Sequence, residues 1–150
     1  MMPDAHKLSL SVQFAVSPLR LPTRQKFRRW LALALQRDAR ITLRIVGARE
    51  GRILNRKYRG KDYPTNVLTF VYDDQAPLTG DIVICAPVVV SEARAQHKEL
   101  GAHYAHLAIH AALHLQGYDH ETEPEAAEME ALETALLAKL RYADPYQAVN

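Results

Sequence analysis

The sequence has little cysteine and no long apolar run, and both absences narrow the class of protein. Its one cysteine, Cys85, excludes an internal disulfide framework and fits a reducing cytosol. In an apolar run, Cys85 is expected to be an inert core residue. No apolar stretch approaches the roughly 18 residues that a membrane-spanning helix needs. The start, residues 1–4, lacks the charged-then-apolar layout of a signal peptide. We therefore expect a cytoplasmic protein.

Repeats, linkers and low-complexity tracts are also missing, so the 150 residues are expected to form one domain. Alternating or β-branched apolar runs predict four strands, at 8–14, 40–46, 67–72 and 81–85. Helical spacing and helix-start residues predict helices at 22–38, 48–58, 87–116 (broken near Gly101) and 122–140. Residues 60–66 and 73–80 have loop and turn chemistry. This order predicts an α/β (α+β) fold with a small mixed four-stranded sheet packed by about five helices.

Charge is distributed unevenly along the chain. Residues 1–61 carry 15 Lys and Arg against 3 Asp and Glu, whereas residues 62–150 carry 4 against 14. A basic first half favours a polyanionic partner, although solvated helix faces explain such a split equally well. Function must therefore be argued from a site.

Four histidines form a stripe along the helix predicted before residue 116. His110 and His114 are four residues apart, which places both imidazoles on one face, about 6 Å apart at the backbone. Zinc–nitrogen bonds of about 2.0–2.1 Å allow such a pair to share one ion. His106 lies about 12 Å from His114 along a helix, too far to join it. His103 and His106 are expected to be ordinary core or surface residues, with support of the site as the minority interpretation.

A third ligand must come from beyond the helix, and Gly117 supplies the necessary break. Glycine can take the left-handed conformation that ends a helix, so the chain can turn back and present His120. The pattern His-x-x-x-His-x-x-Gly-x-x-His thus predicts one zinc ion per chain held by His110, His114 and His120, at the end of a histidine-bearing helix. Three neutral ligands leave a fourth position open for water, as in catalytic zinc sites.

Zinc proteases of the metzincin type share this spacing, but they place glutamate directly after the first histidine. That position here is Ala111, which cannot move a proton, so a peptidase is the weaker alternative. For phosphodiester cleavage, zinc can activate water, polarise a phosphoryl oxygen, or both, while a guanidinium stabilises the charge of the transition state. The basic loop at 55–62 offers Arg56, Arg59 and Lys61 for that role, and the spacing does not choose among them.

The segment 110–120, His-Ala-Ala-Leu-His-Leu-Gln-Gly-Tyr-Asp-His, resembles the signature of the YbeY family of bacterial zinc-dependent endoribonucleases. Two more segments match that family, at 55–70 (Asn-Arg-Lys-Tyr-Arg-Gly-Lys-Asp-Tyr-Pro-Thr-Asn-Val-Leu-Thr-Phe) and 80–85 (Gly-Asp-Ile-Val-Ile-Cys). The resemblance covers most of residues 40–120. It implies cleavage of single-stranded RNA in ribosomal RNA maturation and ribosome quality control, with Arg59 as the catalytic arginine and the same three histidines as zinc ligands.

The resemblance also implies contacts with a small-subunit ribosomal protein and with a GTPase of ribosome assembly. No membrane partner and no DNA specificity are expected. Two positions depart from the family pattern: Ala111 replaces the usual glycine, and Asn66 stands where many members have aspartate. The extra methyl of Ala111 is expected to narrow the pocket beside the zinc. A zinc-stabilised RNA-binding ribosome-assembly factor without turnover is the main alternative function.

Overall fold

The computed structural model describes residues 6–147 and contains the expected alternation of strands and helices. Its elements are β1 (Leu8–Phe14), α1 (Arg24–Ala34), β2 (Ala39–Val46), α2 (Ala48–Arg59), β3 (Val67–Asp73), β4 (Leu78–Cys85), α3 (Ala86–Ala95), α4 (Leu100–Leu115) and α5 (Glu123–Lys139). The predicted α+β class, with a four-stranded mixed sheet and five helices, is confirmed for this part of the chain.

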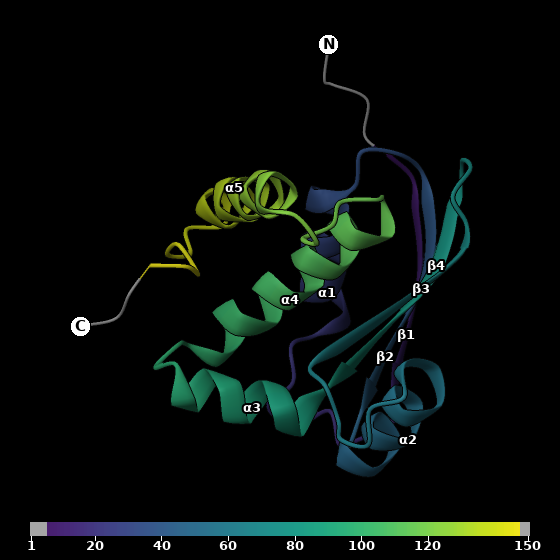
Figure 1. Cartoon of the computed structure of the whole chain (residues 1–150), viewed down its shortest axis with the longest axis vertical. Coiled ribbons are helices and arrows are strands. Elements are labelled where there is room, and N and C mark those ends of the chain that lie inside the picture. The colour runs from purple at the N-terminus through teal and green to yellow at the C-terminus, as the bar shows by residue number, and fades with distance from the viewer. Residues whose placement is uncertain (1–5, 148–150) are drawn as a thin grey trace.

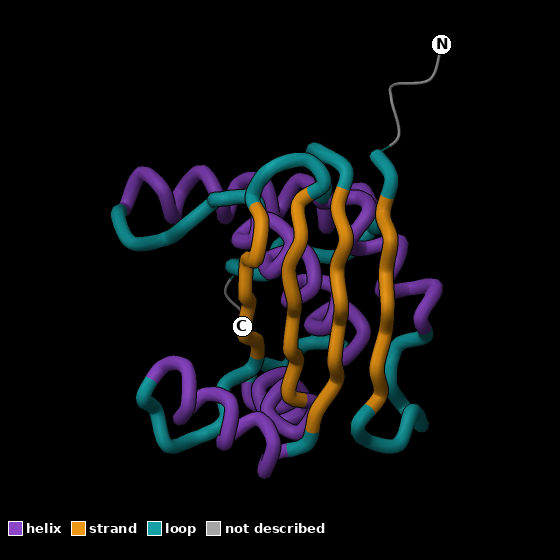
Figure 2. Tube along the Cα trace, turned by 90° about the vertical axis from the view of Figure 1, so that its right-hand side faces the viewer, coloured by secondary structure: helices purple, strands orange, loops and turns teal. Residues whose placement is uncertain are grey.

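The strands form one sheet in the order β1-β2-β4-β3. β1, β2 and β4 run parallel to one another, whereas β3 runs antiparallel to β4 after a short turn. Figure 2 shows the four strands side by side with most of the helices behind them. Because β3 is last in the order, one of its edges is not paired within the sheet, and the candidate site lies along that edge.

The main core lies between the sheet and the helices α1, α4 and α5. α4 runs across the middle of this layer, with α1 behind it and α5 and α3 on either side (Figure 1). Most of the apolar side chains of α4 are buried in this core, which is why a helix with so little polar surface is stable here. A smaller cluster, built from Val46, Leu68, Val83 and Cys85, packs against Leu54 of α2. Cys85 is therefore a core residue, as expected.

Gly80 allows β3, β4 and the end of α4 to approach one another closely. A side-chain carbon at this position would lie 2.6 Å from the carbonyl oxygen of Phe70 and 3.0 Å from Leu115. Such contacts are too short for any residue other than glycine. The glycine of the 80–85 motif therefore permits β3 and the end of α4 each to approach β4 closely.

Two helix boundaries differ from the predictions, each because of a specific contact. α1 ends at Ala34 rather than near residue 38, because the Gln116 side chain accepts from the Gln36 backbone N–H (2.7 Å) and donates to the Ala34 carbonyl (2.9 Å). The break predicted near Gly101 lies instead at residues 96–99, where His97 takes a left-handed conformation with φ of 55°. Gly101 itself belongs to the first turn of α4.

β4 is also longer than predicted, since Leu78, Thr79 and Gly80 already pair with the start of β2. Within residues 6–147, none of the helices combines the length and apolar character needed to cross a bilayer.

Candidate functional site

The histidine helix ends as the sequence predicts, at a left-handed glycine. Gly117 has φ of 102°, its N–H donates to the His114 carbonyl (3.0 Å), and the Tyr118 N–H donates to the Leu113 carbonyl (3.2 Å). This pair of bonds satisfies the last carbonyls of α4 and reverses the chain direction. His120 follows three residues later and faces back toward the helix.

The rings of His110, His114 and His120 form a triangle. Their centroids are 6.4 Å apart for His110 and His114, 5.7 Å for His110 and His120, and 6.4 Å for His114 and His120. A tetrahedral ion with Zn–N bonds of about 2.0–2.1 Å would hold the centroids roughly 5 Å apart. The triangle is thus slightly wider than a chelate, and no set of three His, Cys, Asp or Glu side chains within residues 6–147 has metal-binding geometry as it stands.

Hydrogen bonds orient the two helical histidines toward the cleft. The Nδ1 of His110 lies 2.6 Å from Glu133 Oε2, and the Nδ1 of His114 lies 3.0 Å from the Tyr118 carbonyl oxygen. Both partners are acceptors, so each Nδ1 carries a proton, and in the neutral form of the ring Nε2 has the free lone pair that a metal needs. A histidine that binds a metal through one nitrogen typically donates the other N–H to such an acceptor. The donor set therefore fits a metal, although the distances still have to close.

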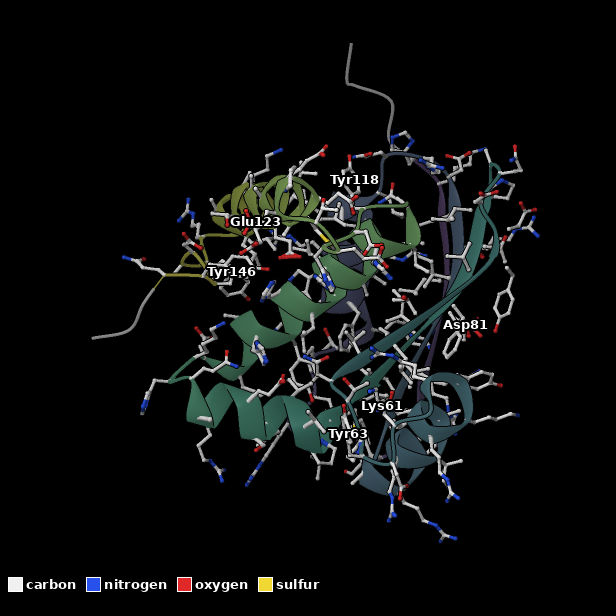
Figure 3. All side chains as sticks on the ribbon, in the orientation of Figure 1. Lys61, Tyr63, Asp81, Tyr118, Glu123 and Tyr146 are labelled. Carbon is white, nitrogen blue, oxygen red and sulfur yellow. The ribbon has the colours of Figure 1, made fainter. Side chains whose placement is uncertain are left out.

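Glu133 is the residue that the sequence reasoning missed. It comes from α5, is fully buried, and also binds His106 Nε2 (3.0 Å) and the hydroxyl of Tyr146. Burial opposes its ionisation, but the hydrogen bonds from His106, His110 and Tyr146 outweigh burial and lower the pKa of Glu133 to about 2. Tyr146 lies beside α4 and α5 (Figure 3).

A signal for Glu133 was present in the sequence. It occupies the middle of a buried stripe, four residues from Met129 and four from Leu137, where an unpaired carboxylate would be very unfavourable. A charged residue on an apolar stripe predicts a buried partner. His106 is thus connected to the site through Glu133, which supports the minority interpretation for this residue.

A cleft of about 580 Å³ brings the predicted residues together. It runs along the free edge of β3, between the second half of α4 and the end of α2. Its lining includes Arg59, His110, His114 and His120, together with Tyr58, residues 67–70, Asp119 and Glu121. Of the three cations that the sequence left open, only Arg59 lines this cleft; Arg56 and Lys61 do not.

The position of Arg59 is fixed by the way α2 ends. Gly60 takes a left-handed conformation with φ of 70°, and its N–H donates to the Arg56 carbonyl. The buried Asn55 side chain donates to the Tyr63 carbonyl (2.7 Å), and Arg52 pairs with Asp62 (2.8 Å), so the loop is held against the helix. Figure 3 shows Lys61 and Tyr63 beside α2, well away from Tyr118 at the end of α4.

Asn66 has a structural reason to be an amide. Its side-chain oxygen accepts from the Val67 N–H (2.7 Å), and its Nδ2 donates to Glu92 (3.1 Å). The same Glu92 carboxylate binds His103 Nε2 at 3.0 Å. An aspartate at position 66 would place a second carboxylate against Glu92. His103 is buried, and burial lowers its pKa, as expected for an ordinary core histidine.

Ala111 is fully buried in the main core and does not line the cleft, so its methyl does not narrow the cleft. It faces away because it follows His110 directly on the helix. Asp119 lines the cleft, and its side chain accepts the backbone N–H of His120 (2.8 Å).

Comparison with known proteins identifies the family of this chain. The family model described as "Endoribonuclease YbeY" matches residues 19–141. Proteins named Endoribonuclease YbeY from Nitrosomonas eutropha and Aromatoleum aromaticum are each 57% identical to this chain; the first match covers 91% of this chain and 97% of the relative, and the second covers 93% of both. A Thermotoga maritima protein solved in solution superposes with a TM-score of 0.55 at 25% identity, over 93% of this chain and 99% of that one. The chain belongs to the YbeY family.

Proposed function

We propose that this chain is one zinc-dependent endoribonuclease domain that cleaves single-stranded RNA during ribosomal RNA maturation and ribosome quality control. The observation that carries the proposal is the presence of Arg59 in the same cleft as His110, His114 and His120. The relatives' name, Endoribonuclease YbeY, supports an RNA substrate. Arginine suits this role because its planar fork matches phosphate oxygens.

The proposed ligands of one zinc ion are His110, His114 and His120. Two of them already present Nε2, because their Nδ1 atoms are bound to Glu133 and to the Tyr118 carbonyl. His120 is exposed on the loop after Gly117, so its ring can move toward the helix, and the His110 and His114 rings, 6.4 Å apart, would also have to turn toward each other to close the triangle. A zinc ion bound there would supply Lewis-acid chemistry for hydrolysis of a phosphodiester.

Arg59 is the proposed catalytic residue. It is exposed at the end of α2, on the opposite side of the cleft from the histidines, so a phosphate between them would contact both. Its guanidinium would neutralise the charge that builds up on the phosphate oxygens in the transition state. The attacking group, water or the RNA 2′-hydroxyl, is identified by the product end: a 2′,3′-cyclic phosphate excludes direct attack by water.

The remaining parts of the proposal follow from the family. The substrate is ribosomal RNA, the partners are the small ribosomal subunit and its assembly factors, and the location is the cytoplasm. A second candidate, a zinc-stabilised RNA-binding assembly factor without turnover, is favoured only by the basic character of α2. It predicts that RNA stays intact under enzyme excess and that zinc removal unfolds the domain.

The decisive test is cleavage of a defined single-stranded RNA with and without a chelator, using the wild type, Arg59→Ala and Arg56→Ala. Arg56 is the matched control, since it lies on the same helix but outside the cleft. We expect Arg59→Ala to lose cleavage by about 100-fold or more with its zinc content intact, and Arg56→Ala to stay near the wild type. Full activity of Arg59→Ala would show that Arg59 is not the catalytic arginine. Cleavage that continues in the presence of the chelator would show that the reaction does not need a metal.

A further inference from the structure

Tyr58 is an exposed aromatic ring in the cleft that the proposed reaction does not use. It directly precedes Arg59 on α2, lines the same cleft, and keeps 54% of its surface exposed. Tyrosine is usually exposed at its hydroxyl end while its ring packs against neighbours. A ring left this open beside the proposed catalytic arginine is available to a ligand.

The ring is held in place from one side. Phe70, half-buried on β3, packs edge-to-face against Tyr58 with centroids 5.0 Å apart and an interplanar angle of 67°. The Nζ of Lys57 lies over the ring, 5.1 Å from the centroid, on a flexible, exposed side chain. The ring is therefore supported by the sheet, and the Lys57 group over it can move aside.

The charges around Tyr58 suit a phosphate backbone. Lys57 and Arg59 flank it in the last turn of α2, and both are exposed. Proteins that hold single-stranded nucleic acid combine such cations with aromatic rings on which bases stack, because every base has a π-face. The two parts of this arrangement are adjacent here.

We propose that Tyr58, supported by Phe70, is a stacking site for one nucleobase of single-stranded RNA, next to the phosphate that contacts Arg59. This inference rests on the proposed function for its ligand, and it deepens that function by assigning a base-binding position. Stacking on a flat ring is tolerant of sequence, so the site selects an unpaired base rather than a particular one. A base inside a duplex has both faces covered, which gives a physical reason for single-strand preference at this cleft.

Two other roles for Tyr58 are distinguishable from stacking. In a purely structural role, the ring would stabilise the packing of α2 against β3 without meeting a ligand. In a protein-docking role, the ring would contact a ribosomal or assembly protein and leave RNA affinity unchanged. Only stacking makes affinity depend on the presence of a base at one defined position of the RNA.

The test measures binding rather than cleavage, so it is independent of turnover. A fluorescent single-stranded oligonucleotide carrying 2′-O-methyl groups is titrated with the protein as isolated, and electrophoresis afterwards verifies that it is uncut. Each position is then replaced in turn by an abasic nucleotide. For the wild type, we expect one position, or two adjacent ones, at which the abasic change weakens binding by about 5–100-fold.

Tyr58→Ala should weaken binding of the intact oligonucleotide by a similar factor and abolish the effect of the abasic change. Tyr58→Phe and Tyr58→Trp should retain both. In the Trp variant, the new fluorophore should be quenched by RNA, whereas the native Trp30 is buried with 3% exposure. Tyr63→Ala is the matched control, since this tyrosine is exposed (56%) but lies outside the cleft.

The proposal is overturned if Tyr58→Ala binds RNA as the wild type does, or if it binds more weakly but stays equally sensitive to the abasic position. A protein-docking role would give the first result. A structural role would give the second, accompanied by a lower unfolding temperature. Absence of cleavage with an intact base-dependent signal would contradict the proposed enzyme but leave the stacking site in place.

Discussion

The two sides of the cleft are built in opposite ways. On the α4 side, His110 and His114 are each fixed through Nδ1, and the carboxylate behind His110 is fully buried. On the α2 side, Tyr58 and Arg59 are exposed, and the Tyr58 ring packs on one side against Phe70 of β3. Hydrogen bonds that orient the ligands before the metal arrives favour metal binding. A flexible RNA strand, by contrast, can be bound by side chains that adjust their positions. The contrast fits the proposal that the α4 side of the cleft holds the metal ion and the α2 side holds the RNA strand.

The largest effect is expected from His114→Ala, which removes a proposed ligand from the rigid wall. Bound zinc should fall from about one ion per chain to well below it, because two imidazoles hold the ion far less tightly than three. Elemental analysis of the purified protein measures this, with circular dichroism to verify the fold. His6→Ala is the control, since His6 is exposed and does not line the cleft. A normal zinc content in His114→Ala would show that His114 is not a zinc ligand.

A smaller effect is expected from Glu133→Gln, which changes the support and leaves all three ligands in place. The neutral amide holds the His110 N–H less strongly, so zinc affinity should fall about 10–100-fold. Competition with a coloured chelator measures the affinity directly. Glu128→Gln is the control on the exposed side of the same helix. Equal affinities in the two variants would show that the buried carboxylate does not organise the site.

The smallest effect compares two tyrosine hydroxyls that both donate to a carboxylate. Tyr146 donates to the buried Glu133, and Tyr72 donates to Asp81 (2.7 Å) on the exposed face of the sheet. Because the bond to Glu133 is shielded from water at the acceptor, Tyr146→Phe should lower the free energy of unfolding by about 1 kcal/mol, and Tyr72→Phe by less than about 0.5 kcal/mol. Chemical denaturation of both variants measures the difference. Equal losses of unfolding free energy in the two variants would show that the buried and the exposed hydrogen bond contribute the same stability.

The sequence predicted the elements that depend on local patterns. Alternation located β1 and β2, and histidine spacing together with Gly117 predicted how the ring triangle is assembled. These features are local because helix periodicity and a left-handed glycine act within a few residues. The proposed roles of the three histidines and of Arg59 stay predictions until the variants are measured.

The features that the sequence did not predict depend on contacts between distant residues. The end of α1 is set by Gln116, about 80 positions away, and the anchor of His110 comes from Glu133, 23 positions away. The break before α4 occurs at His97, which takes a conformation that glycine usually takes, so no local pattern indicates it. Likewise, residue spacing did not distinguish Arg59 from Arg56 and Lys61; the family resemblance pointed to Arg59, and the packed structure places Arg59 alone of the three in the lining of the cleft.

The link between His110, Glu133 and Tyr146 also has a consequence for the order in which the protein is made. Chains are synthesised from the N-terminus, so the cleft wall with Arg59 and the histidine helix both exist before α5 has been added. Until Glu133 follows, the imidazole of His110 lacks the carboxylate that turns its free nitrogen toward the cleft. An unfinished chain therefore carries the proposed ligands without their final arrangement, and that arrangement is completed only as translation reaches the last residues of the domain.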